Sequence, residues 1–220
     1  MRFPNACKGL KKTFFAELIS LIALVPYAVS LVLIQFLPEE IDKNNAEMLP
    51  AEVVVTILSI LSLVMMTVAY VLNVIGYVTA SKDNESFKKA MLLTIAGMVL
   101  TVVSGIMENA NGNPILTNTF DSMENILDLL ITLMTISGIV TLSVTYGDLR
   151  MVESGKALFK FLFAIYLPTL IAYVFVYLLR NTRSAAILAV TVTFISFALN
   201  TVYSLLYLRY LYRAVNMLEE

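Results

Sequence analysis

Six long apolar stretches, separated by short polar loops, constrain this 220-residue chain more than any other feature. A helix needs about 20 apolar residues to cross the hydrocarbon layer of a bilayer. The stretches are continuously apolar rather than alternating, which predicts helices and not barrel strands. With 59% hydrophobic and 14% charged residues, the chain also lacks the polar surface of a soluble globule. The predicted spans cover residues 14–36, 53–80, 90–107, 123–146, 157–179 and 185–207.

The loops between these stretches are too short to hold a separate soluble domain. The sequence therefore predicts an all-α polytopic membrane protein, with six transmembrane helices arranged as three hairpins. Residues 1–220 are expected to form a single transmembrane helical-bundle domain.

The basic residues are distributed unevenly between the two predicted sides of the membrane. Cytoplasmic loops carry an excess of lysine and arginine. Twelve of the 15 basic residues fall in the N-terminal head, the loops after the second and fourth stretches, and the tail. Both termini are therefore expected in the cytoplasm, and the lysine-rich loops suggest a bacterial plasma membrane. The tail, residues 208–220, is expected to prolong the sixth helix and to rest on the membrane surface.

Two pairs of stretches share unusual interior residues. The first and fifth each carry one proline, Pro26 and Pro168, and the second and sixth each carry a Leu-Asn pair that ends in Asn73 or Asn200. Paired proline kinks are candidates for a hinge or a cavity wall. Curvature that improves packing is the favoured alternative, since proline is common in membrane helices. Either a repeated hairpin or convergence explains the pairing.

Small and polar residues recur every three or four positions on most stretches, so each predicted helix has one polar face. Such faces supply the close approach and hydrogen bonds that associate helices in lipid. Tyr203, together with Tyr70 and Tyr166, lies deep in its stretch, and a buried hydroxyl needs a partner. Contacts between helices are favoured for these tyrosines over a place in a cavity wall.

Acidic and polar residues gather on the outer half of the fourth stretch and the loop before it. Ionisable groups inside a membrane are functional suspects. One hypothesis is an outward-facing pocket that attracts cations; the favoured alternative is a solvated helix start whose acids complement the helix dipole. Glu17 and Lys160 are instead expected near the cytoplasmic surface. The pocket candidates are Glu108, Glu124, Asn125, Asp128, Thr132 and Thr135.

The composition argues against most enzyme chemistry. The chain has no histidine and one cysteine, which excludes histidine-ligated haem, histidine-based zinc sites, the usual nucleophile–histidine relay and cysteine-rich metal centres. No convincing catalytic set, metal site or cofactor site is found, and the chain is expected not to be an enzyme.

Three interpretations of function follow. The first is a non-enzymatic protein that acts through protein partners or as a homo-oligomer in the lipid bilayer, with no nucleic-acid partner. The second is a small solute-binding or transport component. The third, an enzyme acting on lipid or peptide, lacks a catalytic set. The Ala16-x-x-x-Ser20 pair, with the size and six-helix topology, resembles the substrate-binding subunits of energy-coupled vitamin importers. That resemblance supports the second interpretation, but the lack of a glycine-rich substrate loop speaks against it, and the first interpretation is the favoured one.

Overall fold

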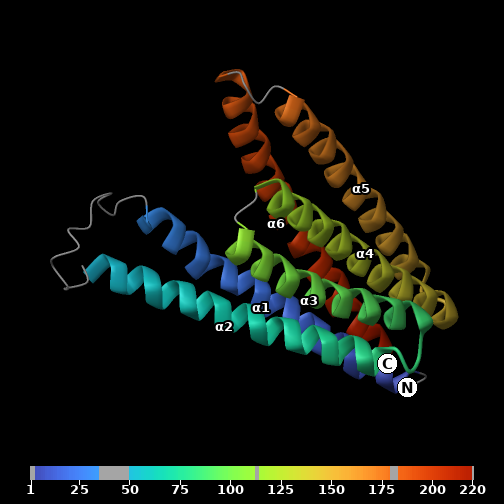
Figure 1. The fold of residues 1–220 in the computed structure, drawn as a ribbon. Coiled ribbons are helices and arrows are strands. Elements are labelled where there is room, and N and C mark those ends of the chain that lie inside the picture. The colour runs from blue at the N-terminus through green and yellow to red at the C-terminus, as the bar shows by residue number, and fades with distance from the viewer. Residues whose placement is uncertain (1–2, 35–49, 112–113, 179–182, 220) are drawn as a thin grey trace.

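The computed structural model describes residues 3–34, 50–111, 114–178 and 183–219, which form six α-helices (Figure 1). No strand occurs in these four segments, so the all-helical prediction is confirmed. Residues 35, 36 and 179, at the ends of two predicted spans, lie outside the described residues. The helices are α1 (Pro4–Ile34), α2 (Pro50–Ala80), α3 (Glu85–Asn111), α4 (Pro114–Tyr146), α5 (Leu149–Leu178) and α6 (Arg183–Glu219).

The helix α1 begins at Pro4, well before the predicted start at residue 14. Proline suits the first turn, where its missing N–H has no intrahelical role. The loop after α2 also caps this end: the backbone N–H of Ala6 donates to Asp83 at 2.8 Å, and the Asn5 amide donates to the same carboxylate at 2.9 Å. A carboxylate at a helix N-terminus satisfies free N–H groups and complements the dipole.

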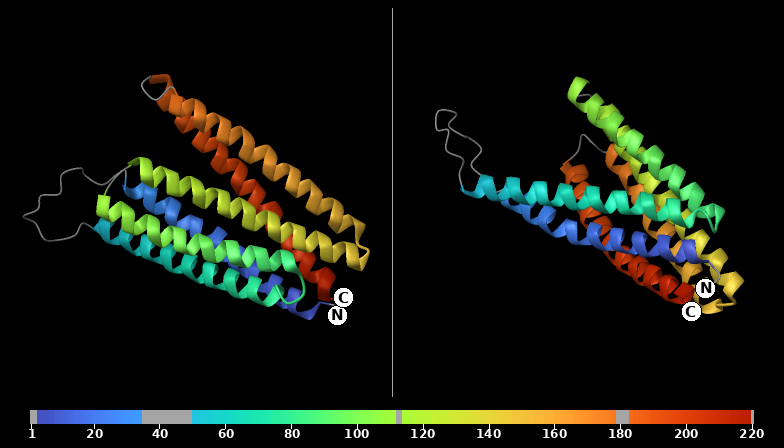
Figure 2. Two further views of the ribbon diagram at one scale, coloured as in Figure 1. Left: turned by 45° about the vertical axis from the view of Figure 1, so that its right-hand side comes forward. Right: turned by 90° about the horizontal axis from the view of Figure 1, so that it is seen from below.

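The six helices form a closed ring. Each helix contacts its neighbours in sequence, and α6 also contacts α1 (Figure 2). The most extensive contacts are within the pairs α1–α2, α3–α4 and α5–α6. The start of α1 and the end of α6 lie side by side at one end of the ring, whereas the α5–α6 pair diverges from α1–α2 toward the other end (Figure 1).

Four helical segments in the described part of the chain are long and apolar enough to cross a bilayer. Their outer faces carry large exposed apolar side chains, with Leu63 68% and Val102 63% exposed. Apolar surface on this scale is typical of a surface covered by lipid or a partner. The finding is consistent with an integral membrane protein. The segments are Pro4–Ile34, Glu52–Ala80, Glu85–Ile106 and Met123–Tyr146.

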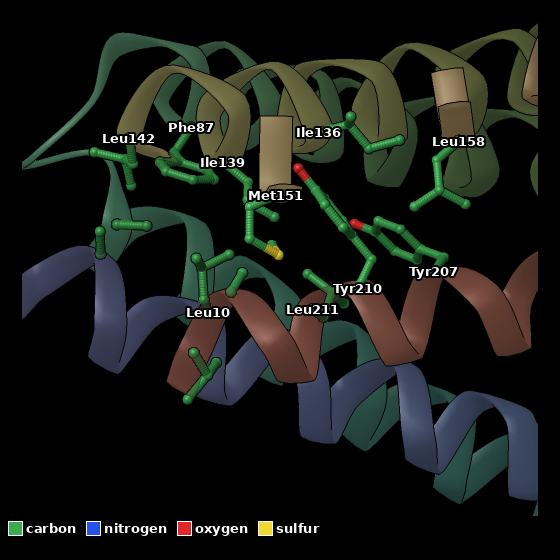
Figure 3. Packing of buried hydrophobic residues seen from close by; sticks show 14 of the residues in the cluster. Leu10, Phe87, Ile136, Ile139, Leu142, Met151, Leu158, Tyr207, Tyr210 and Leu211 are labelled. Carbon is green, nitrogen blue, oxygen red and sulfur yellow. The ribbon is translucent and has the colours of Figure 1, made fainter. Parts of the chain in front are cut away.

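The hydrophobic core fills the end of the ring where α1 begins and α6 ends. Tyr207 and Tyr210 project from α6 into this core, where Leu10 and Phe87 are fully buried (Figure 3). The prediction that the tail rests on the membrane surface is wrong. Residues 208–219 continue α6, and its Leu211, Ala214 and Leu218 are buried in the core. Their spacing of three and four residues gives the tail one apolar face, which packs into the bundle.

Glycines allow the helices to approach closely at this end. A Cβ atom on Gly9 of α1 would lie 2.5 Å from the carbonyl oxygen of Gly76 and 2.7 Å from the Ala80 side chain, both on α2. On α5, a Cβ atom at Gly155 would lie 2.5 Å from the Tyr210 hydroxyl. Because lipid gives no hydrophobic drive for association, such close backbone contact is a main source of helix–helix stabilisation.

We predict that Gly9→Ala destabilises the protein by about 1–3 kcal/mol, because the opposing atoms are backbone atoms of Gly76 and Ala80 and the Ala80 Cβ, none of which can move aside without moving the backbone. The measurement is thermal unfolding of the purified protein in detergent. Gly105→Ala is the matched control, since nothing lies within 4 Å of a Cβ atom there. Equal unfolding temperatures for the two variants would contradict the close packing of α1 on α2.

Candidate functional site

A cavity of about 440 Å³ lies inside the ring, and all six helices contribute to its wall. The cavity lies next to the hydrophobic core, mainly on the side away from the end of the ring where α1 begins and α6 ends. We call it the central cavity. It is lined by Glu17 and Ser20 of α1, Met66, Tyr70, Asn73 and Tyr77 of α2, Thr94 of α3, Asp128, Ile131 and Thr132 of α4, Leu162 and Tyr166 of α5, and Asn200, Tyr203, Ser204 and Tyr207 of α6.

Two carboxyl groups line the central cavity, one from α1 and one from α4. Glu17 lies 13 residues after Pro4, about 20 Å along α1, and Asp128 lies 18 residues before Tyr146, about 27 Å along α4. No lysine or arginine is among the residues that line the cavity in the described part of the chain. The described lining therefore contains two acidic side chains and no basic side chain to pair with them.

The side chain of Asn73 contacts Glu17 in the cavity wall and also has an oxygen without a hydrogen-bond partner in the described structure. The side-chain amide of Asn73 donates to Glu17 Oε1 at 3.2 Å, so α2 orients the carboxylate that α1 supplies. The other polar atom of the amide, Asn73 Oδ1, is buried without a hydrogen-bond partner among the described residues. Buried acceptors are normally paired. This oxygen is available to a ligand that carries a donor.

Five tyrosines also line the central cavity. Tyr203 and Tyr207 are four residues apart on α6, so they share a face, and their rings stack at 6.1 Å with an interplanar angle of 9°. The ring of Phe161 of α5 also stacks on the Tyr203 ring, with the two centroids 6.3 Å apart. The hydroxyl of Tyr203 is buried without a hydrogen-bond partner in the described structure. Tyr70 differs, because its hydroxyl donates to the Thr94 carbonyl of α3.

The residues of the predicted acidic pocket do not all line one cavity in the structure. Asp128 and Thr132 line the central cavity. Thr135 is fully buried one turn deeper and donates to the Tyr77 hydroxyl at 3.1 Å. Glu124 is half-buried and Asn125 is exposed, and neither lines the cavity. Glu108 belongs to α3, but its side chain lies outside the described residues.

The structure also shows where the residues predicted to lie in the interior or at hinges are found. Asn73, Asn200 and Tyr203 line the central cavity. Pro26 is half-buried within α1 and Pro168 is exposed within α5, and both helices continue across their proline. Tyr70 and Tyr203 make the predicted contacts between helices, with Thr94 of α3 and Phe161 of α5, and both also line the cavity. Tyr166 lines the cavity as well.

Glu17 is the residue of the site that sequence reasoning missed. Its expected place near the cytoplasmic surface followed from a helix that was predicted to start at residue 14. Because α1 starts at Pro4, Glu17 lies almost four turns inside the helix. The signal available in the sequence was the polar residue three positions later, Ser20, which shares its face.

Comparison with protein-family models, curated proteins and solved structures finds no match for this chain. Its function is therefore argued from the central cavity itself.

We predict that Glu17→Gln stabilises the protein, because it keeps an oxygen for the Asn73 amide while removing a charge that has no counter-cation. The expected gain is about 1 kcal/mol, or roughly 2–4 °C in unfolding temperature. The difference should shrink as the pH is lowered, since protonation then neutralises the wild-type side chain as well. Glu153→Gln, on the exposed face of α5, is the control. A lower unfolding temperature for Glu17→Gln would contradict the uncompensated charge.

Proposed function

We propose that this protein binds a small organic cation in the central cavity and acts as the solute-binding or transport component of a membrane transporter. All six helices cross the bilayer in this proposal, and both termini lie in the cytoplasm, in agreement with the distribution of basic residues. The bacterial plasma membrane is the proposed location. The observation that carries the proposal is a cavity with two carboxylates and five tyrosines and no lining lysine or arginine in the described structure.

The two carboxyl groups in the cavity wall favour a positively charged ligand. A buried carboxylate is stable only when it is hydrogen-bonded and its charge is compensated. The wall supplies a hydrogen bond to Glu17 through Asn73, but no positive charge. A bound cation provides the missing compensation through its attraction to Glu17 and to Asp128, which lines the cavity but is exposed.

The aromatic wall favours an organic cation over a metal ion. Tyrosine rings attract ammonium and guanidinium groups through their π faces. The unpaired Asn73 Oδ1 and Tyr203 hydroxyl accept hydrogen bonds from N–H donors on the same ligand. The described residues contain no cluster of three or more His, Cys, Asp or Glu side chains suited to a metal ion. A volume of about 440 Å³ is within the usual range of small-molecule pockets.

The alternative of a subunit that acts only through protein partners stays a prediction. An energy-supplying partner is compatible with both interpretations, since a solute-binding component of a transporter also needs one.

We predict that phenethylammonium, a small aromatic cation with N–H donors, binds the purified full-length protein and that Asp128→Asn weakens binding by about tenfold, through the lost charge attraction. Isothermal titration calorimetry in detergent measures both. Glu153→Gln removes an exposed carboxylate outside the cavity and should bind like the wild type. Benzoate, an anion of similar size, should not bind. Equal affinities for Asp128→Asn and Glu153→Gln would rule out a cation site in the cavity.

We also predict that binding of this cation weakens as the pH is lowered, because only ionised carboxylates attract it. The loss follows the protonation of Glu17 and Asp128, and proton uptake accompanies release of the cation. The double variant Glu17→Gln/Asp128→Asn should bind weakly at every pH. Titrations between pH 5 and pH 8 test this, and a wild-type affinity that is independent of pH would contradict the role of the two carboxylates.

A further inference from the structure

A second hollow lies on the outer side of the ring, between α5 and α6. This groove has a volume of about 470 Å³ and is lined by residues of these two helices. Ala157 and Leu206 in its wall are exposed, so the groove faces away from the central cavity toward the surroundings of the ring. We call it the α5–α6 groove.

The groove is polar at one end and apolar at the other. The two helices run antiparallel, and two contacts define their levels: Phe161 stacks on Tyr203, and Gly155 lies against the Tyr210 hydroxyl. Phe161 and Leu206 are therefore at the end toward the middle of the helices. Ser154 and Arg213 are at the end where the bundle closes.

Two arginines stand at the polar end. Arg209 and Arg213 are four residues apart, so they lie on the same face of α6, and both line the groove. Both are exposed, and neither forms an ion pair among the described residues. Glu153 precedes Ser154 on α5 but is not among the residues that line the groove. The polar end is thus a concave site with two unpaired positive charges.

We propose that the α5–α6 groove binds an anionic phospholipid, whose phosphate pairs with Arg209 and Arg213 and whose acyl chain lies along Leu206 and Phe161. Arginine forms bidentate hydrogen bonds with phosphate oxygens. Basic pockets between membrane helices on the cytoplasmic side bind acidic headgroups in this way. The polarity of the groove matches the polarity of a lipid in the leaflet that contains the closed end of the bundle. This proposal does not depend on the ligand of the central cavity.

The test is native mass spectrometry of the full-length protein in detergent, titrated with phosphatidylglycerol. We expect Arg209→Gln/Arg213→Gln to retain about tenfold less of this lipid than the wild type does. Lys88→Gln/Lys89→Gln is the matched control, because it removes two exposed charges from α3 at the same end of the bundle. Phosphatidylcholine, which has no net charge, should be retained weakly by all three proteins. Equal retention of phosphatidylglycerol by the two double variants would overturn the proposal.

Two further measurements distinguish a bound lipid from a free anion. Ala157→Trp fills the groove and keeps both arginines, so it should also reduce retention of phosphatidylglycerol and provides a second variant if the arginine variant fails to fold. Inorganic phosphate at millimolar concentration should not displace the lipid. Displacement by phosphate would identify a site for a free anion and overturn the lipid assignment, as would unchanged retention in Ala157→Trp.

Discussion

Close backbone packing at one end of the ring is the constraint on which the other features of the protein depend. Lipid does not drive apolar helices together, so contact must come from small residues and from hydrogen bonds. Gly9 against Gly76 brings α1 to α2, and Gly155 brings α5 to Tyr210 of α6. Asp83 adds a hydrogen-bonded cap between the α2–α3 loop and α1. With this end closed, the helices can diverge beyond it without separating.

The central cavity is a consequence of that divergence. The carboxyl and amide side chains lie where the helices separate, whereas apolar and aromatic side chains fill the closed end, so polar groups gather around a space instead of packing against one another. Two carboxylates without a counter-cation reduce stability in such a place. Sites that are poorly satisfied without a ligand are a common compromise between stability and binding. Here the two carboxyl groups concerned are Glu17 of α1 and Asp128 of α4.

The helices and their interior faces were predictable because both follow from local periodicity. The ends of α2 and α4 at Ala80 and Tyr146 agree with the predicted spans, and the polar face of α6 with Asn200 and Tyr203 does face the interior. The early start of α1 was not predictable, because its cap comes from Asp83, far along the chain. Spacing also shows which residues share a face but not how near the next helix lies. Tyr166 was therefore expected at a contact and lies in a cavity wall.

The closure of the ring by the end of α6 affects how this protein is made. Leu211, Ala214 and Leu218 belong to the same core as Ala6, Cys7 and Leu10 at the start of α1, and Lys11 pairs with Glu219. During synthesis, the first helix is made long before its partner in the last helix exists. That face of α1 must remain uncovered, or be shielded by another protein, until residue 218 has left the ribosome. Assembly of the ring is therefore a late event, completed only after translation of α6.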